Sequence, residues 1–143
     1  MRNRLVWTLM FLTCIVGVAA VVEAQSPQPN GQRSTSQGVY NREQWQRGRD
    51  LYAGFCASCH PAVTHVGPVF TKSWAGKKLS DLYGYLRERM PKNEPGSLSD
   101  TEYVDVMSYM LRLNGMPAGN HELPADSVAL TKVRIDSSRV SPP

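Results

Sequence analysis

The stretch GFCASCHPA, from Gly54 to Ala62, contains two cysteines separated by two residues and a histidine directly after the second cysteine. Taken alone, these letters fit four kinds of site: covalent haem attachment, a redox dithiol, part of a zinc site, or a chance match. Haem attachment suits the spacing because the thiols of Cys56 and Cys59 can form thioethers with two vinyl groups. The next residue, His60, can then reach the iron as an axial ligand.

Two of these interpretations, the redox dithiol and the zinc site, require sequence features that the chain lacks. A thioredoxin-like dithiol belongs in a strand-helix-strand context, whereas a helical pattern precedes Cys56. A structural zinc site needs four ligands of the Cys or His type, and only His65 and His121 remain to complete the motif. The five residues of the motif cannot by themselves exclude a chance match, so the choice between the interpretations depends on the rest of the chain.

The beginning of the chain predicts export. Arg2 and Arg4 form a basic start, residues 5–22 form an uncharged apolar run, and Val22-Glu23-Ala24 offers a small-residue cleavage site. We therefore expect residues 1–24 to be a signal peptide and the mature protein to be periplasmic. The apolar run is close to the minimum for a spanning helix, so an uncleaved anchor in the inner membrane, with the domain facing the periplasm, is the alternative.

Cysteine use and charge narrow the class of protein further. Cleavage after Ala24 leaves Cys56 and Cys59 as the cysteines of the mature chain, so no disulfide framework is expected. The whole chain has a net charge of +4, and removing residues 1–24 takes away two arginines and one glutamate, which leaves +3. This charge is too mild to indicate nucleic-acid binding. The mature length suits one small domain with a modest core.

Three helices are predicted from the spacing of apolar residues. They are expected over residues 42–54 with Asn41 as N-cap, from Ser80 as N-cap to just before Met90-Pro91, and from the Ser99/Glu102 capping box to Asn114-Gly115. Residues 25–40 are rich in Gln, Ser, Pro and Gly and predict a flexible polar tail. Residues 41–117 are then the domain and residues 118–143 a C-terminal extension, in which SVALTKVRI is either a short extended segment or a loop. No strand is predicted with any strength.

The expected inner faces of these helices agree with a compact helical domain. In the first helix, Trp45, Gly48, Tyr52 and Phe55 fall along one face, and Gly48 has no side chain to keep another backbone away. We therefore expect a close helix crossing at Gly48. In the later helices the inward residues are Leu82, Tyr83, Leu86, Tyr103, Val106, Met107, Met110 and Leu111.

The chain from residue 41 to about 117 resembles a class I bacterial cytochrome c, the small, all-helical, single-haem class. Gly48 and Tyr52 stand eight and four residues before the first cysteine of the motif, and Gly67-Pro68 follows it. WAGKKLSDLYGYLRERMP and SLSDTEYVDVMSYMLRLNG resemble the haem-lining segment and the closing helix of that family. The resemblance implies an all-α fold of about three main helices round one covalent haem c and its iron. It also implies that the carbonyl of Pro68 accepts a hydrogen bond from His60.

The second axial ligand is expected to be Met90. Met90 leaves a helix into a Pro- and Gly-containing loop thirty residues after His60, and the corresponding family position supplies the ligand. Met116, which also precedes a proline, is the main competitor, whereas Met107 and Met110 lie on an inward helical stripe and are expected to fill the core. His65 and His121 are the remaining alternatives.

A His/Met pair implies a low-spin haem of positive potential, because a thioether favours the ferrous state. We therefore expect an electron carrier that works between a dehydrogenase or membrane complex and a terminal acceptor, as a monomer or as a subunit of a complex. Among dehydrogenases, the quinoprotein type is the first candidate. No catalytic constellation is present in the chain. The alternative is a haem subunit of an enzyme, or a gas or peroxide sensor, with a displaceable sixth ligand. The basic residues that could steer an acidic partner are Lys72, Lys77, Lys78, Arg87, Arg89 and Lys92.

Overall fold

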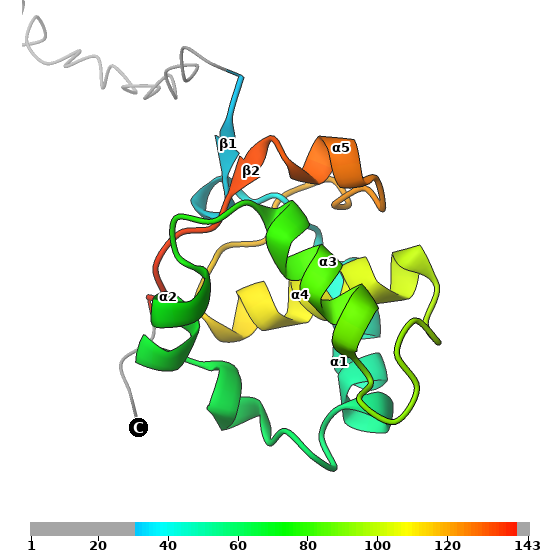
Figure 1. Ribbon diagram of the computed structural model, residues 1–143. Coiled ribbons are helices and arrows are strands. Elements are labelled where there is room, and N and C mark those ends of the chain that lie inside the picture. Colours follow the sequence, from blue (N-terminus) through cyan, green and yellow to red (C-terminus); the bar gives the residue numbers. More distant parts are fainter. Residues whose placement is uncertain (1–30, 140–143) are drawn as a thin grey trace, which may run out of the picture.

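The computed structural model describes residues 31–139, and this part of the chain is mainly helical (Figure 1). The elements, in chain order, are β1 (Arg33–Ser34), η1 (Thr35–Gln37), α1 (Arg42–Phe55), η2 (Ala62–His65), α2 (Pro68–Trp74), α3 (Leu79–Arg89), α4 (Asp100–Leu113), α5 (Ser127–Leu130) and β2 (Val133–Arg134). The expected all-α fold is therefore confirmed. The expected export signal or anchor lies outside the described residues. Within residues 31–139, none of the helices combines the length and the apolar character needed to cross a bilayer.

Helices α1 and α4 cross closely at Gly48, as the sequence predicted. A Cβ atom added to Gly48 would overlap the carbonyl oxygen of Asp105 in α4. Beside this crossing, Arg47 holds the Asp105 carboxylate with two hydrogen bonds of 2.7 and 3.0 Å. The Asp105 side chain is only 4% exposed, so the ion pair is largely removed from water on the acidic side. The absence of a side chain at residue 48 thus sets how near the two helices lie.

Helix α4 has the predicted ends and the predicted inner face. The Ser99 hydroxyl accepts from the Glu102 amide, and the Glu102 carboxylate accepts from the Ser99 amide, so the capping box is present. Asn114 closes the other end of the helix as its C-cap. The five residues expected to point inward are all buried: Tyr103, Val106, Met107, Met110 and Leu111.

Helix α3 ends where it was expected to end but begins earlier. Met90 is its C-cap, and the Met90 amide donates to the Leu86 carbonyl at 2.8 Å. The expectation that Ser80 is the N-cap was wrong, because the helix begins at Leu79 after Lys78. The Asp81 carboxylate accepts from the Lys78 amide at 3.0 Å, which satisfies a free amide at a helix start two residues earlier than the expected one.

Residues 31–40 differ from the flexible polar tail that was expected there. Val39 and Tyr40 are buried, and β1 pairs in parallel with β2 from the C-terminal extension. Asp136 next to β2 accepts hydrogen bonds from the Ser34 hydroxyl and the Ser36 amide. The polar composition of this segment hid its order because its partners lie about a hundred residues further along the chain.

The C-terminal extension completes the core on the same side of the molecule. Leu123, Leu130 and Ile135 are each no more than 2% exposed. The Gln44 side chain in α1 exchanges two hydrogen bonds, of 2.9 and 2.8 Å, with the backbone of Leu123. In Figure 1, β1 and β2 lie at the end of the molecule opposite the loop that follows α1. The extension therefore supports the fold without reaching the motif.

Candidate functional site

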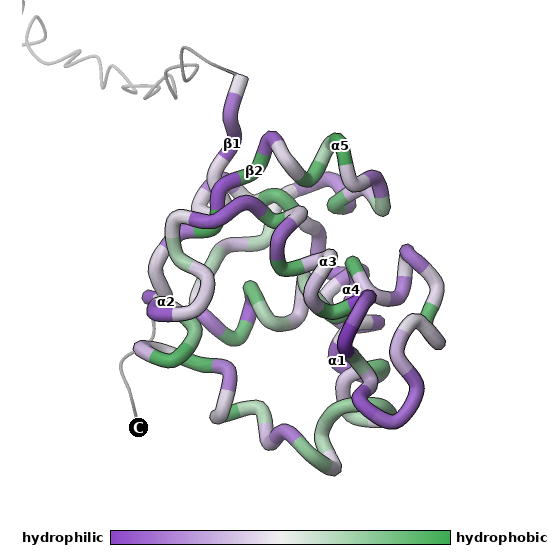
Figure 2. Tube along the Cα trace, viewed as in Figure 1, coloured by the Kyte–Doolittle hydropathy of each residue, from purple (hydrophilic) through white to green (hydrophobic). Residues whose placement is uncertain are grey.

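A cavity of about 680 Å³ lies between the end of α1, α3, α4 and the loop that follows α3. This volume falls in the range of about 300–1,000 Å³ that small-molecule and cofactor sites occupy. Its apolar wall includes Trp74, Leu82, Leu86, Val106 and Met110. Hydrophilic residues occupy the end of α3 and the loop after it, so one rim of the cavity is polar (Figure 2).

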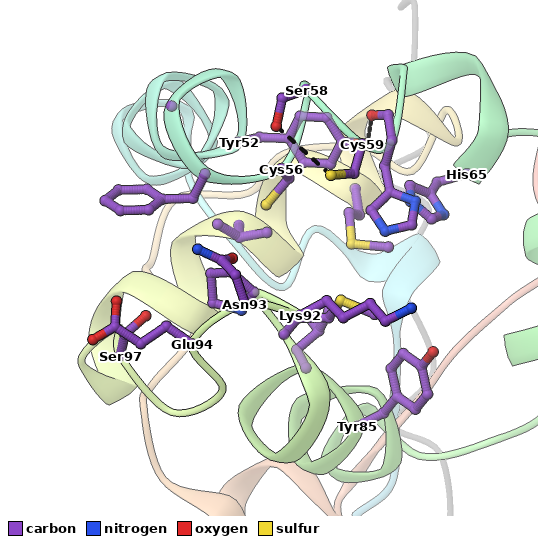
Figure 3. Close-up of a pocket in the computed structure, with 18 of the residues that line it drawn as sticks. Tyr52, Cys56, Ser58, Cys59, His65, Tyr85, Lys92, Asn93, Glu94 and Ser97 are labelled. Carbon is purple, nitrogen blue, oxygen red and sulfur yellow. Dashed lines mark hydrogen bonds between the residues drawn. The ribbon is translucent and has the colours of Figure 1, made fainter.

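Both cysteines of the motif line this cavity. Cys56 is the C-cap of α1, and its carbonyl accepts from the amides of Cys59 and His60 at 3.1 and 2.8 Å. The chain therefore makes one tight turn that brings both thiols to the cavity. Both cysteines are free thiols, and burial raises the pKa of the Cys56 thiol. Figure 3 shows Cys56 and Cys59 on one side of the cavity and Tyr85 and Lys92 on the other.

The backbone of His60 is fixed by Tyr52, one turn before the end of α1. The Tyr52 hydroxyl donates to the His60 carbonyl at 2.6 Å, and Tyr52 is 4% exposed. Burial, with smaller contributions from Cys56 and Tyr109, raises the pKa of Tyr52 to about 12. The hydroxyl thus stays protonated and remains a donor over the whole neutral range, which holds the His60 side of the cavity in place.

His65 lies directly beside His60 in the same cavity. The two imidazole ring centroids are 5.1 Å apart, with an angle of 50° between the ring planes. Burial, and then the nearby charge of His60, lower the pKa of His65. His65 therefore lies on the same side of the cavity as His60. His121 is exposed and does not line the cavity.

The loop that carries His65 is attached to the end of α4 by Asn114. The Asn114 side-chain oxygen accepts from the Gly67 amide at 3.0 Å, and its amide nitrogen donates to the His65 carbonyl at 2.8 Å. Asn114 is fully buried. Sequence analysis gave Asn114 only the role of ending a helix. Its second role depends on a contact between segments almost fifty residues apart, for which the sequence has no local signal.

Pro68, which the family resemblance made the hydrogen-bond partner of His60, does not line the cavity. It is the exposed first residue of α2, a helix that sequence analysis did not predict. The expected hydrogen bond from His60 to the Pro68 carbonyl stays a prediction. The residue whose side chain contacts the His60 ring is His65.

Among the methionines of the described residues, Met90 and Met110 line the cavity. Met90 lies at the end of α3 and is partly exposed, whereas Met110 is a buried residue of α4. Met116, the main competitor in the sequence, is fully buried and lies outside the lining, as does Met107. The structure therefore narrows the choice of thioether to two residues, one of which the sequence had assigned to the core.

Of the basic residues that were expected near the cavity, Lys92 lines it directly. Lys77 lies over the ring of Trp74, at 5.0 Å from the ring centroid, and Trp74 lines the cavity in turn. Arg87 is held by Asp100 at 3.2 Å. Of the expected set, Lys92 is therefore at the cavity, where Glu94 also lies, and Lys77 is next to it through Trp74.

Residues 43–110 match the model of the family described as cytochrome c oxidase, cbb3-type, subunit III. The match covers just under half of the chain and runs from the start of α1 to near the end of α4. Searches of curated proteins and of solved structures gave no significant match. Together with the helical fold, the family match supports a c-type cytochrome domain. A domain of this class carries a covalent haem with iron and transfers electrons through it.

The residues present fit such a haem. Two free thiols, two imidazoles and two thioethers line one cavity, and apolar side chains form much of its remaining wall. They include the groups that haem c requires, two for attachment and two for the iron. A thioredoxin-like dithiol would instead need a strand-helix-strand context, whereas here α1 leads directly into the motif and the one described sheet consists of β1 and β2.

Proposed function

We propose that this chain is an exported, single-haem cytochrome c that carries electrons one at a time between a dehydrogenase or membrane complex and a terminal acceptor. The observation that best supports this proposal is that the required side chains lie at one cavity. The four side chains that the proposal needs line one cavity: Cys56, Cys59, His60 and Met90. Cys56 and Cys59 would hold the haem covalently, and His60 and Met90 would be the ligands of its iron.

When bound, haem supplies one-electron chemistry, because its iron changes between the ferric and ferrous states. The protein supplies attachment, two axial ligands and a largely apolar surrounding. A thioether opposite an imidazole raises the reduction potential relative to two nitrogen ligands. A haem with both axial positions taken by tight ligands offers no open position to a substrate, and for this reason we propose a carrier rather than an enzyme.

The first experiment tests covalent attachment. The protein is expressed with a haem-attachment system, denatured and extracted with acid acetone. We expect the colour to stay with the polypeptide, with one haem per chain by haemochrome assay. Colour that is extracted, or a colourless protein with a reactive dithiol, would overturn the proposal.

The second experiment identifies the sixth ligand. In the oxidised protein, Met90→Ala should abolish the weak red absorption band of a methionine–iron bond. Met110→Leu keeps an apolar side chain in the cavity wall and should leave the band, as should Met116→Ala, which acts outside the cavity. Loss of the band in Met110→Leu but not in Met90→Ala would reassign the ligand. Rapid carbon monoxide binding to the reduced wild-type protein would instead favour the haem enzyme or sensor.

Location and partners form the last part of the proposal. We propose a periplasmic domain, either released or held to the inner membrane by residues 5–22, and a quinoprotein dehydrogenase as the first donor to test. The matched family is described by an oxidase subunit, so an oxidase complex is the second partner to test. The positive charge of Lys77 and Lys92 favours a partner protein whose docking face is acidic. The rate of electron transfer should then fall as salt is added, since salt screens charges between exposed groups.

A further inference from the structure

The segment from Met90 to Ser97 connects α3 to the start of α4 and carries Met90 at its first position. Residues 92–97 are all exposed. Two of the backbone hydrogen bonds of this segment are local, from the Glu94 amide to the Pro91 carbonyl at 3.0 Å and from the Ser97 amide to the Glu94 carbonyl at 3.3 Å. Pro91 near its start and Leu98 just after its end are buried, so further contacts with the core are needed mainly for the exposed residues between them.

One hydroxyl group supplies such contacts at both ends of the segment. The Tyr103 hydroxyl donates to the Met90 carbonyl at 2.7 Å and accepts from the Gly96 amide at 3.0 Å. Tyr103 is 2% exposed, and it lies in the first turn of α4, where its amide donates to the Ser99 carbonyl at 3.0 Å. The hydroxyl is therefore carried by the capped start of α4, which has more buried residues than any other described helix.

We propose that Tyr103 is a positioning residue for the sixth ligand: by holding the Met90 carbonyl and the Gly96 amide together, it keeps the Met90 thioether directed at the iron. This inference rests on the proposed function. Tyr103 itself does not line the cavity, so it acts through Met90 and not on haem. Without its hydroxyl, the segment would spend part of the time in other conformations, and the effective affinity of the methionine ligand would be multiplied by the fraction of molecules in which the segment stays in place.

The chain contains a closely matched control. The Tyr40 hydroxyl donates to the carbonyl of Met116 at 2.6 Å, and both residues are fully buried. Tyr40 and Tyr103 thus make the same kind of bond, from a buried phenol to a methionine carbonyl. They differ in that Met90 lines the cavity and Met116 does not. Replacing either tyrosine by phenylalanine keeps the ring and removes the hydroxyl.

The test uses the oxidised holoprotein and imidazole as an external ligand that competes with the methionine. Met90→Ala defines the affinity for imidazole when the competitor is gone. We expect Tyr103→Phe to bind imidazole roughly tenfold more tightly than wild type, because two hydrogen bonds are lost, and to lie between wild type and Met90→Ala. Tyr40→Phe should stay within about twofold of wild type. Hydrogen exchange of the Gly96 amide should be faster in Tyr103→Phe alone.

The outcomes separate this inference from the proposed function. Unchanged imidazole affinity in Tyr103→Phe, even with faster exchange at Gly96, would overturn the positioning role. Equal gains in Tyr103→Phe and Tyr40→Phe would also overturn it, since a general loss of stability would then explain both. If Met90→Ala binds imidazole no more tightly than wild type, Met90 is not the ligand, and the proposed function fails in this respect before Tyr103 is considered.

Discussion

Replacing Gly48 by alanine tests whether the α1–α4 crossing determines the stability of the domain. The added Cβ would overlap the backbone carbonyl oxygen of Asp105, and no side-chain rotation can relieve a contact with backbone. The helices must move apart, at a cost near the upper end of the range for overpacking, about 3 kcal/mol. Alanine favours the helix over glycine by about 1 kcal/mol. The net loss is therefore about 2 kcal/mol, or roughly 8 °C in Tm at about 4 °C per kcal/mol.

The same substitution at Gly84, in the interior of α3, provides the control. A Cβ at Gly84 meets no other atom within 4 Å, so the helix-propensity gain should appear alone, as a stabilisation of up to about 1 kcal/mol. Both variants are unfolded thermally and in urea, followed by circular dichroism on the haem-loaded protein. Gly48→Ala with wild-type stability or better would refute the crossing as described, whereas opposite signs for the two variants are what the structure requires.

Three further predictions concern the two ends of the fold and the cavity. Asn114→Ala should lower the free energy of unfolding in urea by about 2 kcal/mol, because the buried Gly67 amide loses its acceptor; no loss would mean that the loop is held otherwise. At Asp136, burial raises the pKa, but the hydrogen bonds and an arginine outweigh it, so the pKa lies below its ordinary 3.8. The ionised carboxylate therefore stabilises the fold above pH 3.8, and Asp136→Asn should lower the free energy of unfolding by about 1 kcal/mol at neutral pH. The difference between variant and wild type should shrink as the pH falls below 3.8, and a difference that stays constant would contradict this. Cys56→Ala/Cys59→Ala protein should lack haem and be largely unfolded by circular dichroism, and a sharp, cooperative melt would argue against this.

Much of the helical domain could be predicted because its signals are local. The Asn41 cap, the Ser99/Glu102 capping box and the proline after Met90 each act within four residues of the helix end that they define. The start of α3 was predicted wrongly for a related reason: Ser80 is a good cap by residue type, but a carboxylate one position later satisfies the Lys78 amide instead. The type of a residue shows whether it can cap a helix, but the backbone geometry decides which residue does so.

The order of the two chain ends could not be predicted from composition. Residues 33–40 contain few apolar side chains, and they are held by a parallel pairing and by Asp136, which comes from the far end of the sequence. The same limitation applies to Asn114, whose side chain connects the end of α4 to the loop beside His60. In each case the partner is distant along the chain, so the pattern of neighbouring residues carries no information about it.

The sequence by itself determined which groups are available for haem and so indicated the class of protein, because it contains a C-x-x-C-H motif between a glycine-containing helix and a later helix–Met-Pro loop. The tertiary structure decided which of these groups meet. It brought Met90 to the cavity, left Met116 in the core, and placed His65 beside His60. It also gave Tyr103 the hydrogen bonds that hold the Met90 loop. The physical reason is that the type of a residue fixes which chemistry its side chain can perform, whereas its neighbours depend on tertiary packing, such as the close approach of α1 and α4 at Gly48.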